Sequence, residues 1–67
     1  MNIRYNGIGQ EVQEEISLFQ YLEERDLVNQ PGIAVAVNET VVPKKEWPAY
    51  ILQSNDNVLV IKATQGG

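Results

Sequence analysis

Polar and apolar residues alternate along residues 2–5, as they do in a strand that is buried on one side. Asn6 and Gly7 follow, and this dipeptide favours a type I′ turn because both central residues of that turn need a positive φ. Residues 8–13 return as a weaker strand, since Gly9 dilutes the pattern. The sequence therefore predicts an N-terminal hairpin whose second strand lies at the edge of a sheet.

A helix is predicted to begin after Ser17 and to run to about residue 26. The Ser17 side chain can accept a hydrogen bond from the Gln20 amide, and the Gln20 side chain can reach back to the Ser17 amide, which makes a reciprocal capping box. Apolar and aromatic side chains then recur on one face of the helix, which predicts a stripe buried in the core. The stripe consists of Leu18, Tyr21 and Leu22.

Residues 33–37 have large side chains at alternate positions and alanines between them, which makes them the clearest predicted strand. Residues 40–42 form another short strand, and Pro43 ends it because proline lacks the N–H that a sheet ladder needs. The stretch 44–50 is interpreted as a loop with one helical turn. It holds the single tryptophan, Trp47, which we expect to cover the sheet edge rather than to serve as a platform for a ligand.

Residues 58–61 are an uninterrupted apolar run, which predicts a central strand covered on both faces. Placed beside the first strand and parallel to it, this strand completes a β-grasp arrangement. The expected fold class is therefore α+β: a β-grasp (ubiquitin-like) mixed sheet with one main helix packed on one face. We expect one domain, residues 1–63, followed by a flexible C-terminal tail, residues 64–67, that ends in Gly-Gly.

Composition narrows the classes of function. The chain of 67 residues has a net charge of −4, from nine acids and five bases, which disfavours binding to nucleic acid or to an anionic membrane surface. No apolar stretch is long enough to span a bilayer. Cysteine and histidine are absent, so neither a disulfide nor a Cys/His metal site can form. We expect no bound metal or cofactor, and the lack of a signal segment fits the cytoplasm best.

The remaining chemistry lies at the end of the chain, at Gly66 and Gly67. With no Cβ, these residues can enter a channel too narrow for other side chains, and the Gly67 carboxylate is the one group with unusual access. A tail starting at Ala63 could reach roughly 15 Å. Taken alone, the glycine pair would be interpreted as a frayed end. The sheet face opposite the helix and the basic residues Lys44 and Lys62 are candidates for docking, although each also fits an ordinary surface.

The chain resembles the ThiS family, the bacterial sulfur carriers of thiamine biosynthesis, over nearly its whole length. The resemblance rests on residues 1–6, 34–38 and 41–44, on Trp47 and on the terminal Gly66-Gly67. The stretch from residue 37 to Trp47 is its most specific internal part. The double glycine is shared more widely, with the small subunit of molybdopterin synthase and with ubiquitin-like modifiers.

Two positions depart from the family pattern. The Gly-Asp pair that often precedes the last strand is replaced by Asn55-Asp56, and the apolar residue shortly before the glycines is replaced by the polar pair Thr64-Gln65. These departures bear on the choice of partner more than on the fold.

The resemblance implies that the protein is a co-substrate and not an enzyme. An adenylating (E1-like) partner that uses ATP would activate the Gly67 carboxylate, and Gly66 would let the tail enter that partner's active site. Sulfur from a donor such as a cysteine desulfurase would then give a thiocarboxylate for a thiazole synthase to consume. ATP and persulfide must both be supplied by partners, because nothing in this chain can bind either.

Three alternatives stay open at this point. The first is the small sulfur-carrying subunit of molybdopterin synthase, whose chains are usually longer. The second is a ubiquitin-like protein modifier, in which Gly67 would form an isopeptide bond with a lysine. The third is a β-grasp interaction domain in which the glycines have no chemical role.

Overall fold

The computed structural model describes residues 1–62, and residues 63–67 lie outside the described part. Three of its elements precede the midpoint of the chain: β1 (Asn2–Tyr5), β2 (Ile8–Glu11) and α1 (Leu18–Glu23). The others are β3 (Ile33–Val37), β4 (Thr40–Val41), the 3-10 helix η1 (Lys44–Ala49) and β5 (Asn57–Lys62).

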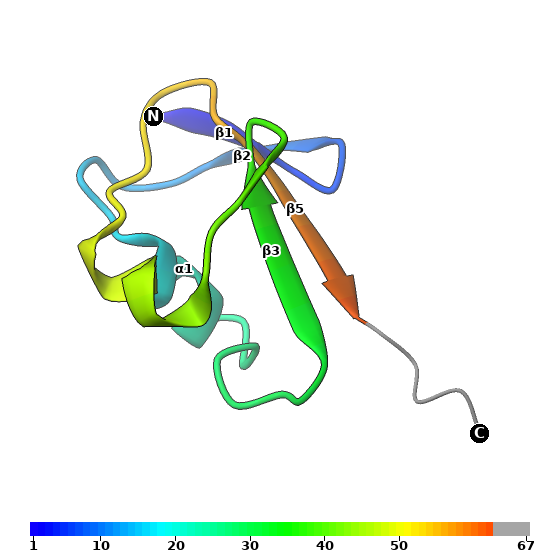
Figure 1. Cartoon of the computed structure of the whole chain (residues 1–67). Helices are drawn as coiled ribbons and strands as arrows, with labels where there is room; N and C mark the ends of the chain where they lie inside the picture. The colour runs from blue at the N-terminus through cyan, green and yellow to red at the C-terminus, as the bar shows by residue number, and fades with distance from the viewer. Residues whose placement is uncertain (63–67) are drawn as a thin grey trace.

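The strands form one sheet in the order β2-β1-β5-β3-β4. Figure 1 labels four of these strands, β1, β2, β3 and β5. The last strand, β5, is central: it runs parallel to β1 and antiparallel to β3. This arrangement confirms the predicted mixed sheet of the β-grasp class and the predicted partner of the last strand.

The N-terminal hairpin forms as predicted. Asn6 and Gly7 have φ values of 48° and 85°, so both central residues of the turn are in the left-handed region. Strand β2 lies at the sheet edge. It ends at Glu11 instead of 13, although the Val12 N–H still donates to the Met1 carbonyl at 2.8 Å.

Helix α1 begins with the predicted capping box. The Gln20 N–H donates to Ser17 Oγ at 3.0 Å, and the Ser17 N–H donates to Gln20 Oε1 at 3.1 Å. These two bonds satisfy backbone donors that the first turn of a helix otherwise leaves unpaired. The side chains of the predicted stripe, Leu18, Tyr21 and Leu22, are all buried.

The helix is shorter than predicted because the chain turns back after Glu23. The Leu27 N–H donates to the Leu22 carbonyl and the Asp26 N–H donates to the Glu23 carbonyl, both at 3.0 Å. Asp26 has a φ of 58°. This pair of bonds around a left-handed residue is the Schellman closure of a helix, with aspartate where glycine is more common.

The core lies on one side of the sheet, between the strands and the two helical elements, α1 and η1, which pack against each other. Its tryptophan, Trp47, is 2% exposed, and Trp47 Nε1 donates to the Val42 carbonyl at 2.9 Å. A ring so deeply buried cannot act as a platform for a ligand. The buried apolar residues are Ile3, Ile16, Leu18, Tyr21, Leu22, Val35, Val37, Val42, Trp47, Leu52 and Val58.

The prediction that residues 58–61 are covered on both faces is wrong. Val58 is buried, but Leu59 and Ile61 are 47% and 54% exposed. Both helical elements lie on the same side of the sheet, so alternate residues of β5 face the core and the surface (Figure 1). The apolar run reflects a central strand with one uncovered face.

Candidate functional site

Strand β5 leads directly to the C-terminal residues, and it is held on both sides at its start. The Arg4 N–H donates to the Asp56 carbonyl at 2.8 Å, and the Asn6 N–H donates to the Val58 carbonyl at 2.9 Å. β1 ends at Tyr5, but the side chain of the next residue, Asn6, also holds β5: Asn6 Oδ1 accepts a hydrogen bond from the Val60 N–H at 2.8 Å. Asn6 therefore extends the support of β5 past the last residue of β1.

The end of β5 is fixed from the other side of the sheet. Pairing with β3 continues to the last residue of the strand, where Lys62 lies opposite Ile33. Lys62 Nζ donates to Gln30 Oε1 at 3.0 Å, and Gln30 Nε2 donates to the Asp26 carbonyl at 2.9 Å. One glutamine side chain thus links the helix closure to the last described residue of β5.

The contributions of Asn6 and Gln30 were not found from the sequence. Asn6 was recognised only as a turn residue, and its bond to Val60 spans 54 positions. The role of Gln30 could not be predicted from a local pattern, because its bond to Lys62 joins two polar residues that are 32 positions apart.

The predicted site residues Gly66 and Gly67 lie outside the described residues, as does the predicted boundary between a domain 1–63 and a tail. Of the basic candidates, Lys62 ends β5 and Lys44 begins η1, and both are exposed. They belong to different elements, one at the start of η1 and the other at the end of β5.

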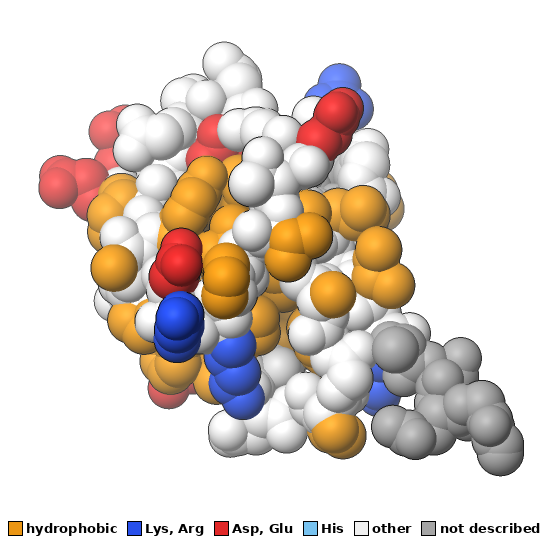
Figure 2. Space-filling view, viewed as in Figure 1, with side chains coloured by type: hydrophobic (Ala, Val, Ile, Leu, Met, Phe, Trp, Pro, Cys, Tyr) orange, Lys and Arg blue, Asp and Glu red, His pale blue; other side chains and the backbone are white. Residues whose placement is uncertain are grey.

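The sheet face opposite the helices is the second candidate. We call it the open face and define it by Ala34 and Ala36 of β3, Val41 of β4, and Leu59 and Ile61 of β5. The register places these side chains on one side, because Ala36 lies opposite both Leu59 and Val41 while Ala34 lies opposite Ile61. The three larger side chains are 47% to 66% exposed, and Figure 2 shows hydrophobic side chains at the surface over the strands. Such a patch on a small protein points to an interaction surface.

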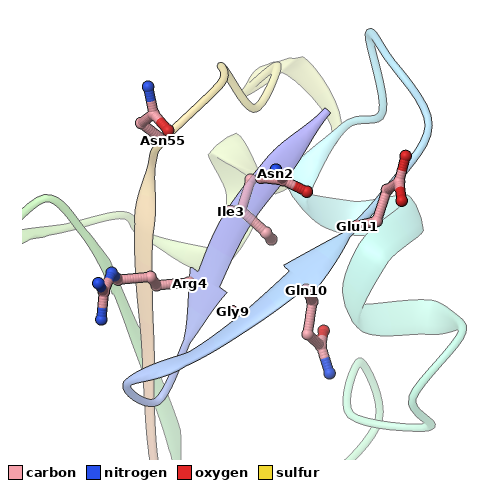
Figure 3. Close-up of a pocket in the computed structure, with 7 residues that line it drawn as sticks. All are labelled: Asn2, Ile3, Arg4, Gly9, Gln10, Glu11 and Asn55. Carbon is pink, nitrogen blue, oxygen red and sulfur yellow. The ribbon is translucent and has the colours of Figure 1, made fainter.

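A hollow adjoins the open face over β1 and β2 (Figure 3). Gly9 of β2 is one of the residues that line it, and a Cβ added to Gly9 would meet no atom within 4 Å. Arg4 extends from β1 toward β5, whereas Glu11 lies on the opposite side of the hollow. Asn2 and Asn55 complete the polar wall.

Among residues 1–62, no cluster of acidic side chains is arranged to hold a metal ion. Tyr21 has its pKa raised above the ordinary 10.0 by burial, against the opposing effect of Arg25. Its hydroxyl donates to Gln10 Oε1 and is therefore committed to the core. In the same residues, no helix is long and apolar enough to cross a bilayer.

The sequence is similar to known proteins over almost its whole length. Residues 3–67 match the ThiS family. The chain is 30% identical over 67 residues to the protein named Sulfur carrier protein ThiS of Escherichia coli (strain K12), with 100% of both chains covered.

Two solved structures from Geobacter metallireducens have a similar fold. A crystal structure of a thiamine biosynthesis protein (ThiS) superimposes with a TM-score of 0.85 at 22% identity, and both chains are covered completely. A solution structure of a thiamine biosynthesis protein gives a TM-score of 0.78 at 22% identity and covers 100% of this chain and 88% of the other. At this identity the two structures support the fold alone.

Proposed function

The chain belongs to the ThiS family, and from that premise we propose that it is a sulfur carrier of thiamine biosynthesis, with Gly67 as the residue that carries the sulfur. The observation that supports this most directly is the match to a curated sulfur carrier over the full length of both chains. Gly66 and Gly67 lie inside the range matched by the family, residues 3–67.

The proposed chemistry starts from the α-carboxylate of Gly67. A carboxylate is a poor electrophile, because its negative charge repels nucleophiles and oxide is a poor leaving group. Attack of a carboxylate oxygen on the α-phosphorus of ATP forms an acyl-adenylate and releases pyrophosphate. The terminal sulfur of the donor's persulfide then adds to the carbonyl carbon, the bond to AMP breaks, and an acyl disulfide forms. A thiol reduces the S–S bond of this acyl disulfide and forms a new disulfide with the donor's sulfur, so a thiocarboxylate remains on Gly67. Free sulfide gives the thiocarboxylate directly, with AMP as the leaving group.

Each of these steps requires a partner. The sequence has no histidine, no cysteine and no glycine-rich phosphate loop, so it lacks the motif with which many proteins bind ATP and the residues that most often activate a nucleophile. We therefore propose an adenylating (E1-like) enzyme that uses ATP, a sulfur donor such as a cysteine desulfurase, and a thiazole synthase that accepts the sulfur. The need for ATP favours the cytoplasm, and the chain itself acts as a co-substrate.

The proposed role of Gly66 is steric. Without a Cβ it can pass through a narrow channel and adopt φ values closed to other residues. Every buried residue of the described core precedes this tail, the last being Val58. Changes at Gly66 or Gly67 are therefore expected to affect loading and not folding.

We predict that Gly67→Ala, or deletion of Gly67, abolishes sulfur loading while leaving thermal unfolding unchanged. The purified chain is incubated with the adenylating enzyme of its host, ATP and sulfide, and its intact mass is measured. Loading replaces one oxygen atom with one sulfur atom. Omitting ATP provides the matched control for the unmodified chain.

Three results would contradict the proposal. Equal loading of the Gly67→Ala chain would show that Gly67 is not the carrier position. Higher-mass conjugates in host lysates that disappear with Gly67→Ala would instead identify a protein modifier. A chain that loads normally but supplies sulfur only to a pterin precursor would belong to molybdenum-cofactor synthesis.

A further inference from the structure

The open face carries a stripe of small side chains beside a stripe of large ones. Strand β3 contributes Ala34 and Ala36, and its neighbour β5 contributes Ile61 and Leu59. The antiparallel register sets each alanine directly opposite one large residue, Ala36 with Leu59 and Ala34 with Ile61. Each of the two large side chains, Leu59 and Ile61, therefore stands next to an alanine, whose small side chain leaves a shallow position beside it.

This pattern is complementary to itself. Neighbouring strands lie about 4.8 Å apart, and packed sheets lie about 10 Å apart. A two-fold axis that runs along the strands, midway between β3 and β5, places β5 of one copy over β3 of the other. Leu59 of each copy then faces Ala36 of the other copy, and Ile61 faces Ala34. At these four positions of β3 and β5, large side chains meet small ones, as close packing between two sheets requires.

The charges at the margins of the face have the same symmetry. In the strand order, β1 and β4 lie at equal distances on the two sides of the β3–β5 boundary. Arg4 of β1 is level with Asn57. Glu39 follows Asn38 in the turn before β4, and the Asn38 N–H donates to the Asn57 carbonyl at 2.8 Å. Glu39 lines a shallow hollow together with Ala36 and Leu59 of the open face, and Asn57 lines it too. The two-fold axis therefore brings Arg4 of each copy opposite Glu39 of the other.

We propose that the open face is a self-association surface on which two copies of this chain pack face to face, with two symmetric Arg4–Glu39 pairs at the margins. The proposal is independent of the sulfur chemistry. The strands β1, β5, β3 and β4 together hold 17 residues. They cover roughly 270 Å² of sheet per copy, against about 800 Å² per partner in a stable complex. The dimer is accordingly weak, reversible and dependent on concentration. Its two β5 strands end on the same side.

The test measures self-association of the full chain. Sedimentation and NMR line widths are recorded from tens of micromolar to about 1 mM, the range in which a weak dimer forms. The wild type is expected to associate progressively across this range. Arg4→Glu alone and Glu39→Arg alone are each expected to weaken association about tenfold, because two favourable charge pairs become two repulsive ones.

Mixing the two variants provides the decisive control. An Arg4→Glu chain facing a Glu39→Arg chain regains both opposite-charge pairs, so the mixture is expected to associate about as well as the wild type. Unchanged thermal unfolding of each variant alone shows that both substitutions are tolerated, as expected for exposed residues. The same recovery is expected in the double variant Arg4→Glu/Glu39→Arg.

Three results would overturn the proposal. If the wild-type chain stays monomeric at about 1 mM, the open face does not bind a second copy of this chain, and a different protein is its partner. Failure of the mixture to recover association rules out the symmetric pairs. Loss of association with Ile8→Lys on the edge strand β2, but not with either charge reversal, would assign the contact to edge-to-edge pairing.

Discussion

Individual polar side chains connect segments that are distant in the sequence. The Asp56 carboxylate is 6% exposed, and both of its oxygens accept hydrogen bonds: Oδ1 from Asn38 Nδ2 and Oδ2 from the Gln53 N–H, each at 2.8 Å. Asn38 Oδ1 in turn accepts from the Asn57 N–H at 2.9 Å. Asp56 thus ties the turn between β3 and β4 to the start of β5.

We predict that Asp56→Asn destabilises the fold by about 1–3 kcal/mol. The asparagine side chain has only one acceptor oxygen, and its NH2 group replaces the other. That NH2 group then faces one of the two donors that the carboxylate had bound, and this buried donor loses its hydrogen bond. The free energy of unfolding is measured by urea denaturation at neutral pH. Asp26→Asn is the matched control: that aspartate is exposed, and asparagine tolerates its left-handed backbone, so a change within about 0.5 kcal/mol is expected. Equal effects of the two substitutions would contradict this account.

At the scale of elements, the N-terminal hairpin and helix α1 are joined by an aromatic and cationic cluster. The Arg25 guanidinium carbon lies 5.1 Å from the Tyr5 ring centroid and 4.4 Å from the Tyr21 ring centroid. Gln10 Oε1 accepts hydrogen bonds from both Tyr21 and Arg25. The two tyrosine rings meet edge to face, with centroids 5.7 Å apart. This cluster fastens the edge strand β2 to the helix.

Two tyrosines, Tyr21 of this cluster and Tyr50 outside it, predict a loss of stability at alkaline pH. Burial raises the pKa of Tyr21 above its ordinary value of 10.0, and burial has the same effect on the pKa of Tyr50. Below pH 10 both groups keep their protons in the folded and unfolded chains, so their contribution is fully present. As the pH rises from 10 through the folded pKa, the unfolded chain loses its protons first and stability falls.

The measurement is urea unfolding at a series of pH values from neutral to above 10. Tyr21→Phe is expected to be less stable at neutral pH, because its hydroxyl bond to Gln10 is lost, but to show a shallower alkaline decline than the wild type. Tyr50→Phe is expected to reduce the remaining slope. Parallel curves for the wild type and Tyr21→Phe would mean that this hydroxyl does not contribute to the alkaline loss.

The whole molecule is a single sheet with a core on one side. The two helical elements cover that side, and the opposite side consists of the open face and the neighbouring strands β1 and β2 (Figure 1). Leucines of the two sides therefore contribute very differently to stability. Leu52 is 1% exposed, whereas Leu59 is 47% exposed.

We predict that Leu52→Ala costs about 2–5 kcal/mol of unfolding free energy, because it removes buried apolar area and leaves a cavity. The same truncation at Leu59 is expected to cost less than about 1 kcal/mol, since that side chain is half in water. Both variants are measured by denaturant titration at a dilution where self-association is negligible. A large loss at Leu59 under these conditions would show that the open face is not free in the isolated chain.

Local chemistry in the sequence determined much of this protein. The Asn6-Gly7 turn, the Ser17–Gln20 capping box and the buried helix stripe depend on residues within a few positions of one another, and all three are confirmed. The central place of β5 also followed from the sequence, because the most apolar strand gains most from two neighbours. The assignment of Gly67 as the carrier residue, and of Gly66 as the residue that lets the tail enter a partner's active site, rests on the sequence as well, and it stays a prediction.

Tertiary structure alone decided which surfaces are covered. An apolar run cannot reveal how many layers pack on a sheet, so the exposure of Leu59 and Ile61 appeared only once both helical elements were placed on one side. The bonds from Asn6 to Val60 and from Gln30 to Lys62 likewise join residues far apart in the chain. Contacts of this kind depend on how the whole chain folds back on itself, and no local pattern encodes them.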